Sequence, residues 1–234
     1  MDFKKLNDQV RRPTHPTRAP RDAVSNISGA KYFTKLDARH SYWQVPLSDD
    51  AKPLTSFMMP CGRFRYLRNP QGLISAGDEF NRRTDAAFEQ LTNFAKVVDD
   101  CLAYDADFGS HIHHVCEVLT CARKHGVTMS PSKFEFGVQE VNFGGFHITG
   151  DGWTVEDDKI SAIPDFPMPT NRTDLRSFLG LVNQFGEFIS CLADIAQPLC
   201  GLLKTATEFI WDEHHSQAVN QIKAALISPP VLAF

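Results

Sequence analysis

The chain has 234 residues, of which 42% are hydrophobic and 22% are charged. This length suits one large domain or two small ones, and the composition excludes a disordered chain, because disorder requires fewer apolar residues and more net charge. No apolar run reaches the roughly 18 residues that a membrane span needs, and no secretory signal is visible. The six cysteines form no C-x-x-C pair and are expected to be free thiols in a reducing, intracellular setting.

The net charge of −4 is distributed unevenly along the chain. Residues 1–39 carry nine basic and four acidic groups, and residues 61–83 carry five and two. Residues 84–109 carry six acidic groups and one lysine. A basic surface beside a concentrated acidic spot suits a site that grips phosphates next to a metal ion, although a mixed solvated surface gives the same counts.

Sequence patterns divide the chain near residues 150–155. Residues 1–30 hold three prolines and little periodicity, which favours an extended or looped segment. Alternation and helical spacing then predict, in chain order, a strand at 32–36, a hairpin with strands at 55–59 and 64–67, a helix at 75–91, a hairpin around residues 99–100, a helix at 110–124, and a strand pair at 134–136 and 141–148. Beyond residue 155 the pattern is helical and broken by prolines. The order up to residue 150 fits a split β-α-β sheet backed by two helices.

Local signals predict where the helices begin and end. Ser75 with Asp78 three residues later resembles a capping box, in which the two side chains satisfy free backbone groups of the first turn. Gly126 is a plausible stop signal for the second helix, because glycine accepts the left-handed conformation that often ends a helix.

Three aspartates give the strongest chemical signal. Asp37 follows the first predicted strand, and Asp99 and Asp100 stand at a hairpin turn between two apolar runs. A surface turn does not need apolar flanks, so these flanks place the carboxylates at the edge of a core. Gathering three carboxylates costs on the order of several kcal/mol at an effective dielectric near 20, and a divalent cation would remove that cost. Oxygen ligands and phosphates suit Mg²⁺, and two such ions would activate a 3′-hydroxyl and stabilise a leaving pyrophosphate.

Several segments resemble reverse transcriptase motifs, and they occur in the family's order over nearly the whole chain. The segments are Phe33–Leu47 for the first catalytic motif, Asn69–Gly72 for the Leu-Pro-Gln-Gly motif, Val97–Asp100 for the Tyr-x-Asp-Asp box, Ser130–Phe136 for the lysine motif, Val141–Phe146 for the primer-grip strand pair, and Leu175–Leu181 with Phe209–Trp211 for the segments that follow. The sequence therefore resembles the reverse transcriptase domain of a gypsy-like long-terminal-repeat retrotransposon, part of a retrovirus-related Pol polyprotein.

The resemblance implies an RNA-directed DNA polymerase that transfers nucleotides onto a primer 3′-hydroxyl with two Mg²⁺ ions, or Mn²⁺ in their place. The implied roles are metal binding and catalysis for Asp37, Asp99 and Asp100; nucleotide contact for Tyr42, Gln71 and Lys133; and primer contact for Val97, Phe143, Gly144 and Gly145. Tyr42 would be the steric gate against the ribonucleotide 2′-hydroxyl. Without the family, core packing explains Tyr42 and Phe143, a solvated surface explains Lys133, and a turn explains Gln71.

The resemblance also implies a fold and partners. The α+β fold would be a right-hand polymerase palm, an antiparallel sheet with helices on one face, with partial fingers and a mainly helical thumb-like C-terminal region. Residues 1–30 would be a remnant of the fingers, 31–152 the palm with part of the fingers, and 153–234 the thumb- or connection-like region before a ribonuclease H domain. The partners would be an RNA or DNA template with its primer, deoxynucleoside triphosphates, and the fingers, ribonuclease H and integrase parts of a polyprotein, within a cytoplasmic or nuclear particle and without a membrane.

Three departures from the family pattern bear on activity. Val97 stands where the box usually has tyrosine, and Asn69 replaces the usual leucine or methionine. The resemblance further implies that this segment lacks the earlier fingers strands, which would bring basic groups to the triphosphate, so we expect the segment alone to be weak or inactive.

Two other functions compete with the DNA polymerase. The first is a non-catalytic relic or domesticated segment that keeps the fold and binds nucleic acid, which the retention of three mutually repelling aspartates disfavours. The second is an RNA-directed RNA polymerase. The aromatic ring of Tyr42 argues against it, because such an enzyme must admit the 2′-hydroxyl.

Histidines and cysteines crowd residues 111–125, which raises the question of a zinc site. Their spacing matches no common zinc pattern, and several of them would project from different sides of one helix. We therefore predict solvated helix histidines in this segment.

Overall fold

The computed structural model describes residues 2–25, 27–156, 158, 163–183, 185–204, 208–227 and 232. The chain forms two compact units, residues 1–144 and 145–234, and each is described by itself. The division into fingers remnant, palm and thumb-like region at residues 30 and 152 concerns functional parts of the family, not compact units, and it stays a prediction.

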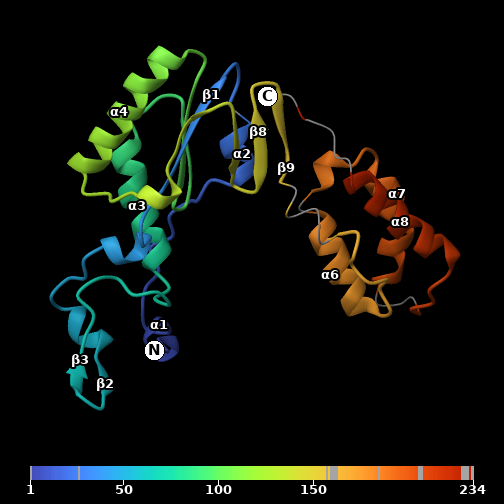
Figure 1. Ribbon diagram of the computed structural model, residues 1–234. Coiled ribbons are helices and arrows are strands. Elements are labelled where there is room, and N and C mark those ends of the chain that lie inside the picture. Colours follow the sequence, from blue (N-terminus) through green and yellow to red (C-terminus); the bar gives the residue numbers. More distant parts are fainter. Residues whose placement is uncertain are drawn as a thin grey trace. The chain divides into compact units, whose positions relative to one another are not determined.

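A four-stranded antiparallel sheet organises the first unit (Figure 1). Its strand order is β4 (Phe94–Val97), β5 (Asp100–Asp105), β1 (Tyr32–Asp37) and β6 (Glu135–Val138). The central strands β5 and β1 carry the fully buried side chains of Phe33, Leu36 and Leu102. Their apolar runs suit a central position, because a strand between two others is more buried than an edge strand. The predicted first strand is confirmed.

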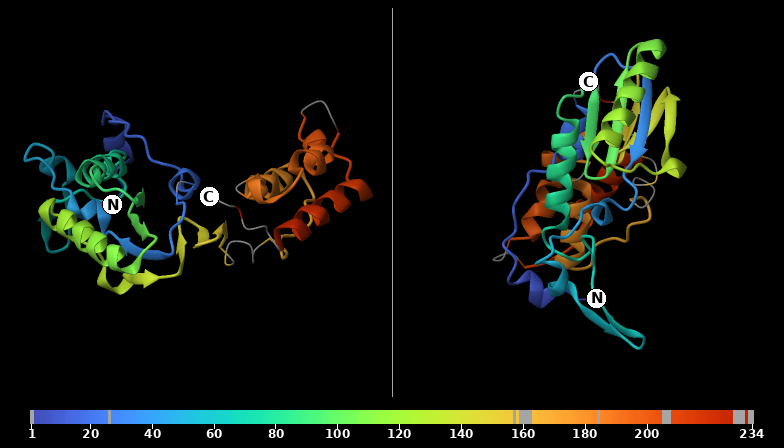
Figure 2. Two further views of the ribbon diagram at one scale, coloured as in Figure 1. Left: turned by 90° about the horizontal axis from the view of Figure 1, so that it is seen from above. Right: turned by 90° about the vertical axis from the view of Figure 1, so that its left-hand side faces the viewer.

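Two helices cover one face of this sheet, as the views in Figures 1 and 2 agree. They are α3 (Ala76–Phe88) and α4 (Phe108–Lys124). Leu36 of β1 packs in one cluster with Phe88 of α3 and with Val115 and Val118 of α4. The predicted antiparallel sheet with two helices on one face is confirmed.

Both helices begin differently from the prediction, and α3 ends three residues early, at Phe88. Helix α4 starts earlier than expected, because Asp107 caps it by accepting a hydrogen bond from the Ser110 N–H at 2.9 Å. Gly126, with φ of 71°, follows its last turn as predicted. The capping box at the start of α3 is wrong, because Ser75 makes no side-chain cap bond and Asp78 instead accepts from Arg12 at 2.6 Å.

The remaining elements of the first unit lie around the sheet. They are α1 (Lys4–Asn7), α2 (Pro20–Val24), η1 (Ser41–Gln44), η2 (Lys52–Thr55), β2 (Phe57–Met59), β3 (Gly62–Phe64), η3 (Pro131–Lys133) and β7 (Glu140–Phe143). Two short helices therefore interrupt the segment that was expected to be extended or looped. The predicted hairpin forms as β2 and β3, which project from the rest of the unit (Figure 1).

The strands differ from the prediction in boundaries and in pairing. The second strand of the hairpin is residues 62–64 rather than 64–67, because a two-residue turn at 60–61 closes it early. Strand β6 pairs with β1, not with the residues around 141–148. The predicted strand at 141–148 is broken after Phe143, where Gly144 has φ of 61°.

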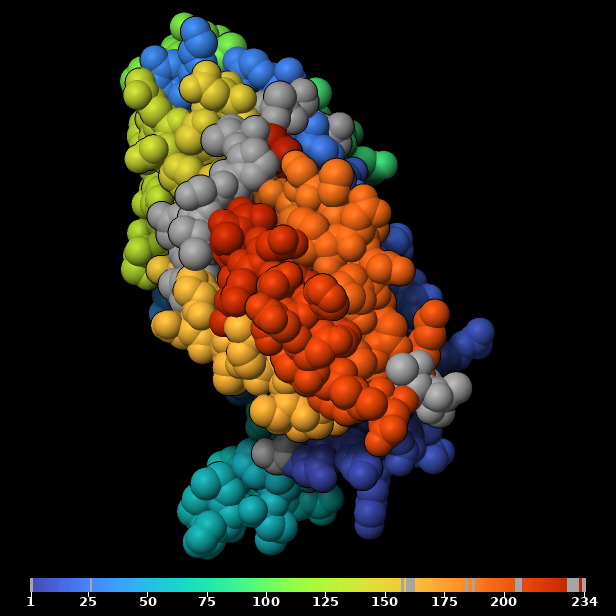
Figure 3. All heavy atoms as spheres, turned by 90° about the vertical axis from the view of Figure 1, so that its right-hand side faces the viewer, coloured from blue at the N-terminus to red at the C-terminus, as the bar shows by residue number. Residues whose placement is uncertain are grey.

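The second unit combines a hairpin with helices. The hairpin is β8 (Phe146–Thr149) and β9 (Gly152–Val155), and the helical elements are α6 (Arg172–Asn183), η4 (Gly186–Phe188), α7 (Leu192–Leu202) and α8 (Glu213–Ile227). Helices α7 and α8 pack side by side, in orange and red in Figure 3. The predicted helical character of this region is confirmed. Among the described residues, no helix is long and apolar enough to cross a membrane.

Leu36→Ala should lower the free energy of unfolding by about 2–5 kcal/mol, because it leaves a cavity under both helices. Leu54→Ala is the matched control, since the Leu54 side chain is 63% exposed and its truncation should change stability by no more than about 0.5 kcal/mol. Urea denaturation followed by circular dichroism measures both. Equal effects of the two substitutions would contradict the core described above.

Candidate functional site

The two central strands bring Asp37 and Asp100 together. Asp37 ends β1, Asp100 begins β5, and the antiparallel register sets these two residues directly opposite each other. Directly opposed residues of a sheet project to the same face. Asp100 therefore lies on a strand, not in the turn where the sequence placed it, and its carboxylate shares a face with that of Asp37.

This face is the one that the helices leave free. Side chains alternate between the two faces of a strand, and Leu36 belongs to the cluster under α3 and α4. Asp37 therefore projects away from the helices, and Asp100 with it. The alternation gives the carboxylates a face that a ligand can approach, although Asp37 itself is only 7% exposed.

Asp99 lies in the turn that joins β4 to β5. Residues 98 and 99 form this turn, and Val98 has φ of 54°, a strained conformation for a β-branched residue. Such strain costs on the order of 1–3 kcal/mol and persists only where the surroundings enforce it. The Ala38 N–H donates to the Asp99 carbonyl at 2.8 Å, which ties the turn to the residue after Asp37.

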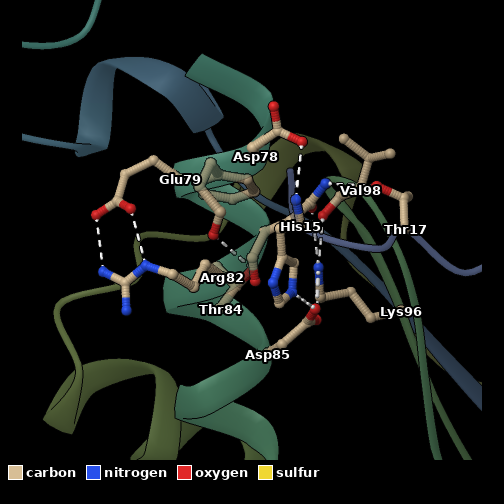
Figure 4. A network of polar contacts seen from close by, with 11 residues as sticks. His15, Thr17, Asp78, Glu79, Arg82, Thr84, Asp85, Lys96 and Val98 are labelled. Carbon is tan, nitrogen blue, oxygen red and sulfur yellow. Dashed lines mark hydrogen bonds and ion pairs between the residues drawn. The ribbon is translucent and has the colours of Figure 1, made fainter. Parts of the chain in front are cut away.

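A polar network behind the turn helps to hold it in place (Figure 4). The ammonium group of Lys96 on β4 lies 3.0 Å from an Asp85 carboxylate oxygen and donates to Asn81 Oδ1 at 3.1 Å and to the Val98 carbonyl at 3.3 Å. His15 Nε2 contacts the other Asp85 oxygen at 2.7 Å. Helix α3 and the N-terminal segment thus support the strained peptide.

The surroundings of Asp100 disfavour its ionised form. Burial raises the pKa of Asp100; Lys35 opposes this shift, and the neighbouring charges of Asp99 and Asp37 add to it. Lys133 donates to Asp37 Oδ2 at 2.7 Å, and this bond raises the pKa of the lysine. The ammonium group offsets part of the negative charge, while its side chain remains 63% exposed.

The chemistry of these donors fits a divalent cation. Asp37, Asp99 and Asp100 offer only carboxylate oxygens, which Mg²⁺ and Mn²⁺ prefer. A cavity of about 490 Å³ adjoins Asp37 and is lined also by Arg39, His40, Ser130 and Lys133. Burial is the main cause of the raised pKa of Asp100, and a cation bound by the carboxylates would relieve the repulsion from Asp99 and Asp37 that adds to it. The three aspartates thus have the donor chemistry that a divalent cation needs.

Two of the predicted nucleotide contacts lie in different environments. Tyr42 in η1 is half-buried, and its ring meets the edge of Phe80 with centroids 6.3 Å apart. Its hydroxyl oxygen lies 3.7 Å from where a Cβ on Gly77 would sit, so it borders α3. Gln71 is exposed in the loop before that helix.

The predicted primer contacts also lie in different environments. Val97 is half-buried and pairs with Asp100, so it lies on the face of the carboxylates. Phe143 is only 1% exposed, so its ring packs in the core and the residue offers almost no surface to a primer. A Cβ on Gly144 would lie 3.0 Å from Pro20, and its φ of 61° also favours glycine. Gly145, with φ of 92°, begins the second unit.

Several residues beside the aspartates were not singled out from the sequence. Arg39 and His40 lie two and three residues after Asp37, and Lys35 lies two residues before it, so proximity in sequence could have suggested all three. Lys96 had no such signal, because its partners Asn81 and Asp85 on α3 are remote in sequence. The prediction of solvated histidines in α4 is wrong for His111, which is fully buried.

Comparisons with known proteins agree on one family. Residues 1–148 match the family described as reverse transcriptase (RNA-dependent DNA polymerase). The Tf2-3 and Tf2-7 transposon polyproteins of Schizosaccharomyces pombe are 31% and 30% identical to this chain over 234 residues, which cover 99% of this chain and 18% of each polyprotein. The chain therefore spans about a fifth of the length of these curated relatives.

Solved structures of a foamy viral protease-reverse transcriptase share the fold at 23% identity. The structure with double-stranded DNA gives a TM-score of 0.91 and covers 99% of this chain and 41% of that chain. The structure with an RNA/DNA hybrid gives 0.84 and covers 99% and 32%. The likeness confirms the predicted polymerase-type α+β fold.

Asp100→Asn should stabilise the metal-free protein at neutral pH. The folded state raises the pKa of Asp100. Ionisation of this carboxyl therefore lowers the stability of the wild-type protein once the pH rises above about 4, the ordinary pKa of an aspartate. The gain from the substitution should vanish near pH 3, where the carboxyl is protonated, and grow toward pH 7. Urea denaturation in EDTA across this pH range measures it.

Asp49→Asn is the control of opposite sign. Its hydrogen bond from Lys52 lowers the pKa of Asp49, so the wild-type carboxylate contributes stability above its ordinary pKa and loses it as the pH falls. This substitution should slightly destabilise the protein near pH 7 and have no effect near pH 3. A stability gain at Asp49, or none at Asp100, would contradict these environments.

Proposed function

This chain belongs to the reverse transcriptase family, as its resemblance to retrotransposon sequences predicted, and we propose that it is the RNA-directed DNA polymerase segment of a retroelement polyprotein. The observation that carries the proposal is the register that opposes Asp37 to Asp100, with Asp99 in the adjoining turn. We assign these three aspartates the binding of two divalent ions, Mg²⁺ or Mn²⁺. Such ions would activate a primer 3′-hydroxyl and stabilise the leaving pyrophosphate.

The chain's own residues then bind and orient the substrates. Lys133 shields Asp37, and its exposed ammonium group is near enough to the site to attract a triphosphate. Arg39 lines the same cavity and offers a planar group that suits phosphate oxygens. Phosphoryl transfer depends mostly on such positioning and charge stabilisation, which agrees with a site built from charged side chains.

Tyr42 is proposed as the gate that admits deoxyribonucleotides. Its ring is held by Phe80 and by the apolar cluster of Ala38 and Val45, yet it stays half-exposed. A ring fixed by packing resists displacement by an added hydroxyl, so packing and gating are compatible here. An RNA-directed RNA polymerase, which must accept that hydroxyl, is the less favoured assignment.

The proposed nucleic-acid partner is a template with its primer. The foamy viral structures hold double-stranded DNA or an RNA/DNA hybrid, which makes a duplex the natural candidate here. The basic groups at residues 61–83 are only partly available, because Arg82 and Arg83 both bond Glu79 and lower its pKa to about 2. Arg63 and Arg65 are exposed near the β2–β3 hairpin and remain for phosphate contact.

The alternative is a non-catalytic relic that still binds nucleic acid. Val97 favours the relic. Its position beside Asp100 is one from which a side chain would reach the primer end, but valine has no phenol to make that contact. The strained turn and its supporting network favour the polymerase, since strain at a turn is retained where a site uses the geometry. Metal binding and catalysis separate the two readily.

Asp99→Asn should weaken Mn²⁺ binding and reduce primer extension by about 1,000-fold, since losing a metal ligand removes roughly 4 kcal/mol of transition-state stabilisation. Electron paramagnetic resonance of Mn²⁺ measures binding even where turnover is slow, and extension of a primer on RNA with Mg²⁺ or Mn²⁺ measures activity. Asp49→Asn, at an exposed aspartate remote in sequence, is the control and should change neither. Mn²⁺ binding without any extension would support the relic.

Tyr42→Ala should raise ribonucleotide incorporation relative to deoxyribonucleotide incorporation by roughly 10–100-fold, the selectivity that about 1–3 kcal/mol of steric clash provides. Tyr42→Phe keeps the ring and should keep the discrimination. Single-nucleotide extension with each substrate gives the two efficiencies. If the alanine variant discriminates as well as the wild type, Tyr42 is a packing residue alone.

A further inference from the structure

Three potential metal ligands meet at the other end of β5 from the aspartate cluster. Asp105 ends β5, and His111 and His114 lie one turn apart on α4. His111 Nδ1 and His114 Nδ1 lie 2.6 and 2.8 Å from the same Asp105 oxygen, Oδ2, and the three ligand atoms all fall within 4.8 Å of one another. Five residues of strand, about 17 Å, separate Asp105 from Asp100.

The cluster also lies on the opposite face of the sheet from the proposed catalytic aspartates. Asp105 alternates in phase with Cys101 and Ala103, which pack under the helices, whereas Asp100 is out of phase with them. This group of side chains therefore cannot belong to the polymerase site, and the chemistry proposed above makes no use of it.

The charge of the cluster calls for a cation. Asp105 is 9% exposed, His111 is fully buried, and with neutral imidazoles the group carries one negative charge. Among the described residues, no lysine or arginine forms an ion pair with Asp105. The partners of this buried carboxylate are the two imidazole rings and the Asn93 amide, and a cation held between the carboxylate and the rings would compensate its charge.

The surroundings of the two rings suit metal ligation through Nδ1. His111 Nε2 lies 2.6 Å from Thr34 Oγ1, a partner that fixes the ring and can accept its remaining N–H. His114 Nε2 is buried and has no partner in the described part of the chain. The His114 side chain and Asp105 line a cavity of about 600 Å³, together with Thr92, Ser110 and Glu117. Water in that cavity could complete a coordination shell.

We propose that Asp105, His111 and His114 form a zinc site that fastens helix α4 to the end of β5. Two imidazoles and a carboxylate, with a water molecule from the cavity as fourth ligand, are a donor set that Zn²⁺ takes in tetrahedral geometry. With bonds of about 2.0 Å, ligand atoms in a tetrahedron lie roughly 3.3 Å apart. Side-chain rotation that lengthens the His111 and His114 contacts by about 0.7 and 0.5 Å reaches that spacing.

The sequence pattern hides this site because its ligands come from two kinds of element. The two histidines are three residues apart on one helix, but the third ligand ends a strand. The exposed residues His113 and His125, and the cysteines of the same helix, take no part in it. Only the packing of α4 on the sheet brings the carboxylate to the two rings.

The test is zinc binding by the whole chain. After incubation with zinc and gel filtration, mass spectrometry should find about one zinc per wild-type chain, and zinc should raise the Tm by about 5 °C. His114→Gln should lose both effects. His125→Gln, at an exposed histidine of the same segment, is the matched control and should keep them.

Two further variants locate the ion. Asp105→Asn should also lose zinc while keeping the side chain's shape, which covers the case that His114→Gln disturbs the fold. Asp99→Asn should retain zinc, because the proposed site is remote from the aspartate cluster. Bound Co²⁺ should give tetrahedral absorption bands without thiolate charge transfer, since no cysteine is a ligand.

Three results would overturn the proposal. Wild-type protein that binds no zinc would leave an imidazolium–carboxylate group in its place. Zinc that persists in both His114→Gln and Asp105→Asn would lie elsewhere. Zinc lost only in Asp99→Asn would belong to the aspartate cluster, and that result would leave the proposed polymerase function standing.

Discussion

The antiparallel pairing of β1 with β5 is the constraint on which the rest of the first unit depends. It opposes Asp37 to Asp100 and Leu36 to Cys101, so one register sets both the polar face and the helix-covered face. A slip of one residue would send every side chain of a strand to the other face, which would bury a carboxylate under the helices. The buried side chains of Leu36 and Ala103 make such a slip costly, and thereby fix the aspartates.

The turn between β4 and β5 depends on support from outside the sheet. Val98 holds a conformation that its branched side chain disfavours, and its carbonyl accepts a bond from Lys96. Lys96 is in turn fixed by Asp85 of α3, which also contacts His15. Helix α3 covers one face of the sheet, but through Lys96 of β4 it also helps to position the turn that holds Asp99.

The two charged clusters at the ends of β5 differ in how the negative charge of their carboxylates is compensated. At one end, the repelling carboxylates retain a partly exposed face, and Lys133 offsets part of their charge. At the other end, Asp105 is enclosed by His111 and His114, which can share a cation or a proton. Exposure suits substrates that come and go, whereas enclosure suits a group that stays in place.

The sequence by itself determined the class of this protein and the identity of its chemical groups. Periodicity predicted the strands and helices of the first unit, and the ordered motifs around Asp37 and Asp99 predicted the family, because both signals are local in the chain. Tertiary structure alone decided the register that sets Asp100 on a strand, the strain at Val98, and the burial of His111. These depend on partners far apart in sequence, as the bond from Lys133 to Asp37 illustrates, and no local pattern encodes which strands and helices will meet.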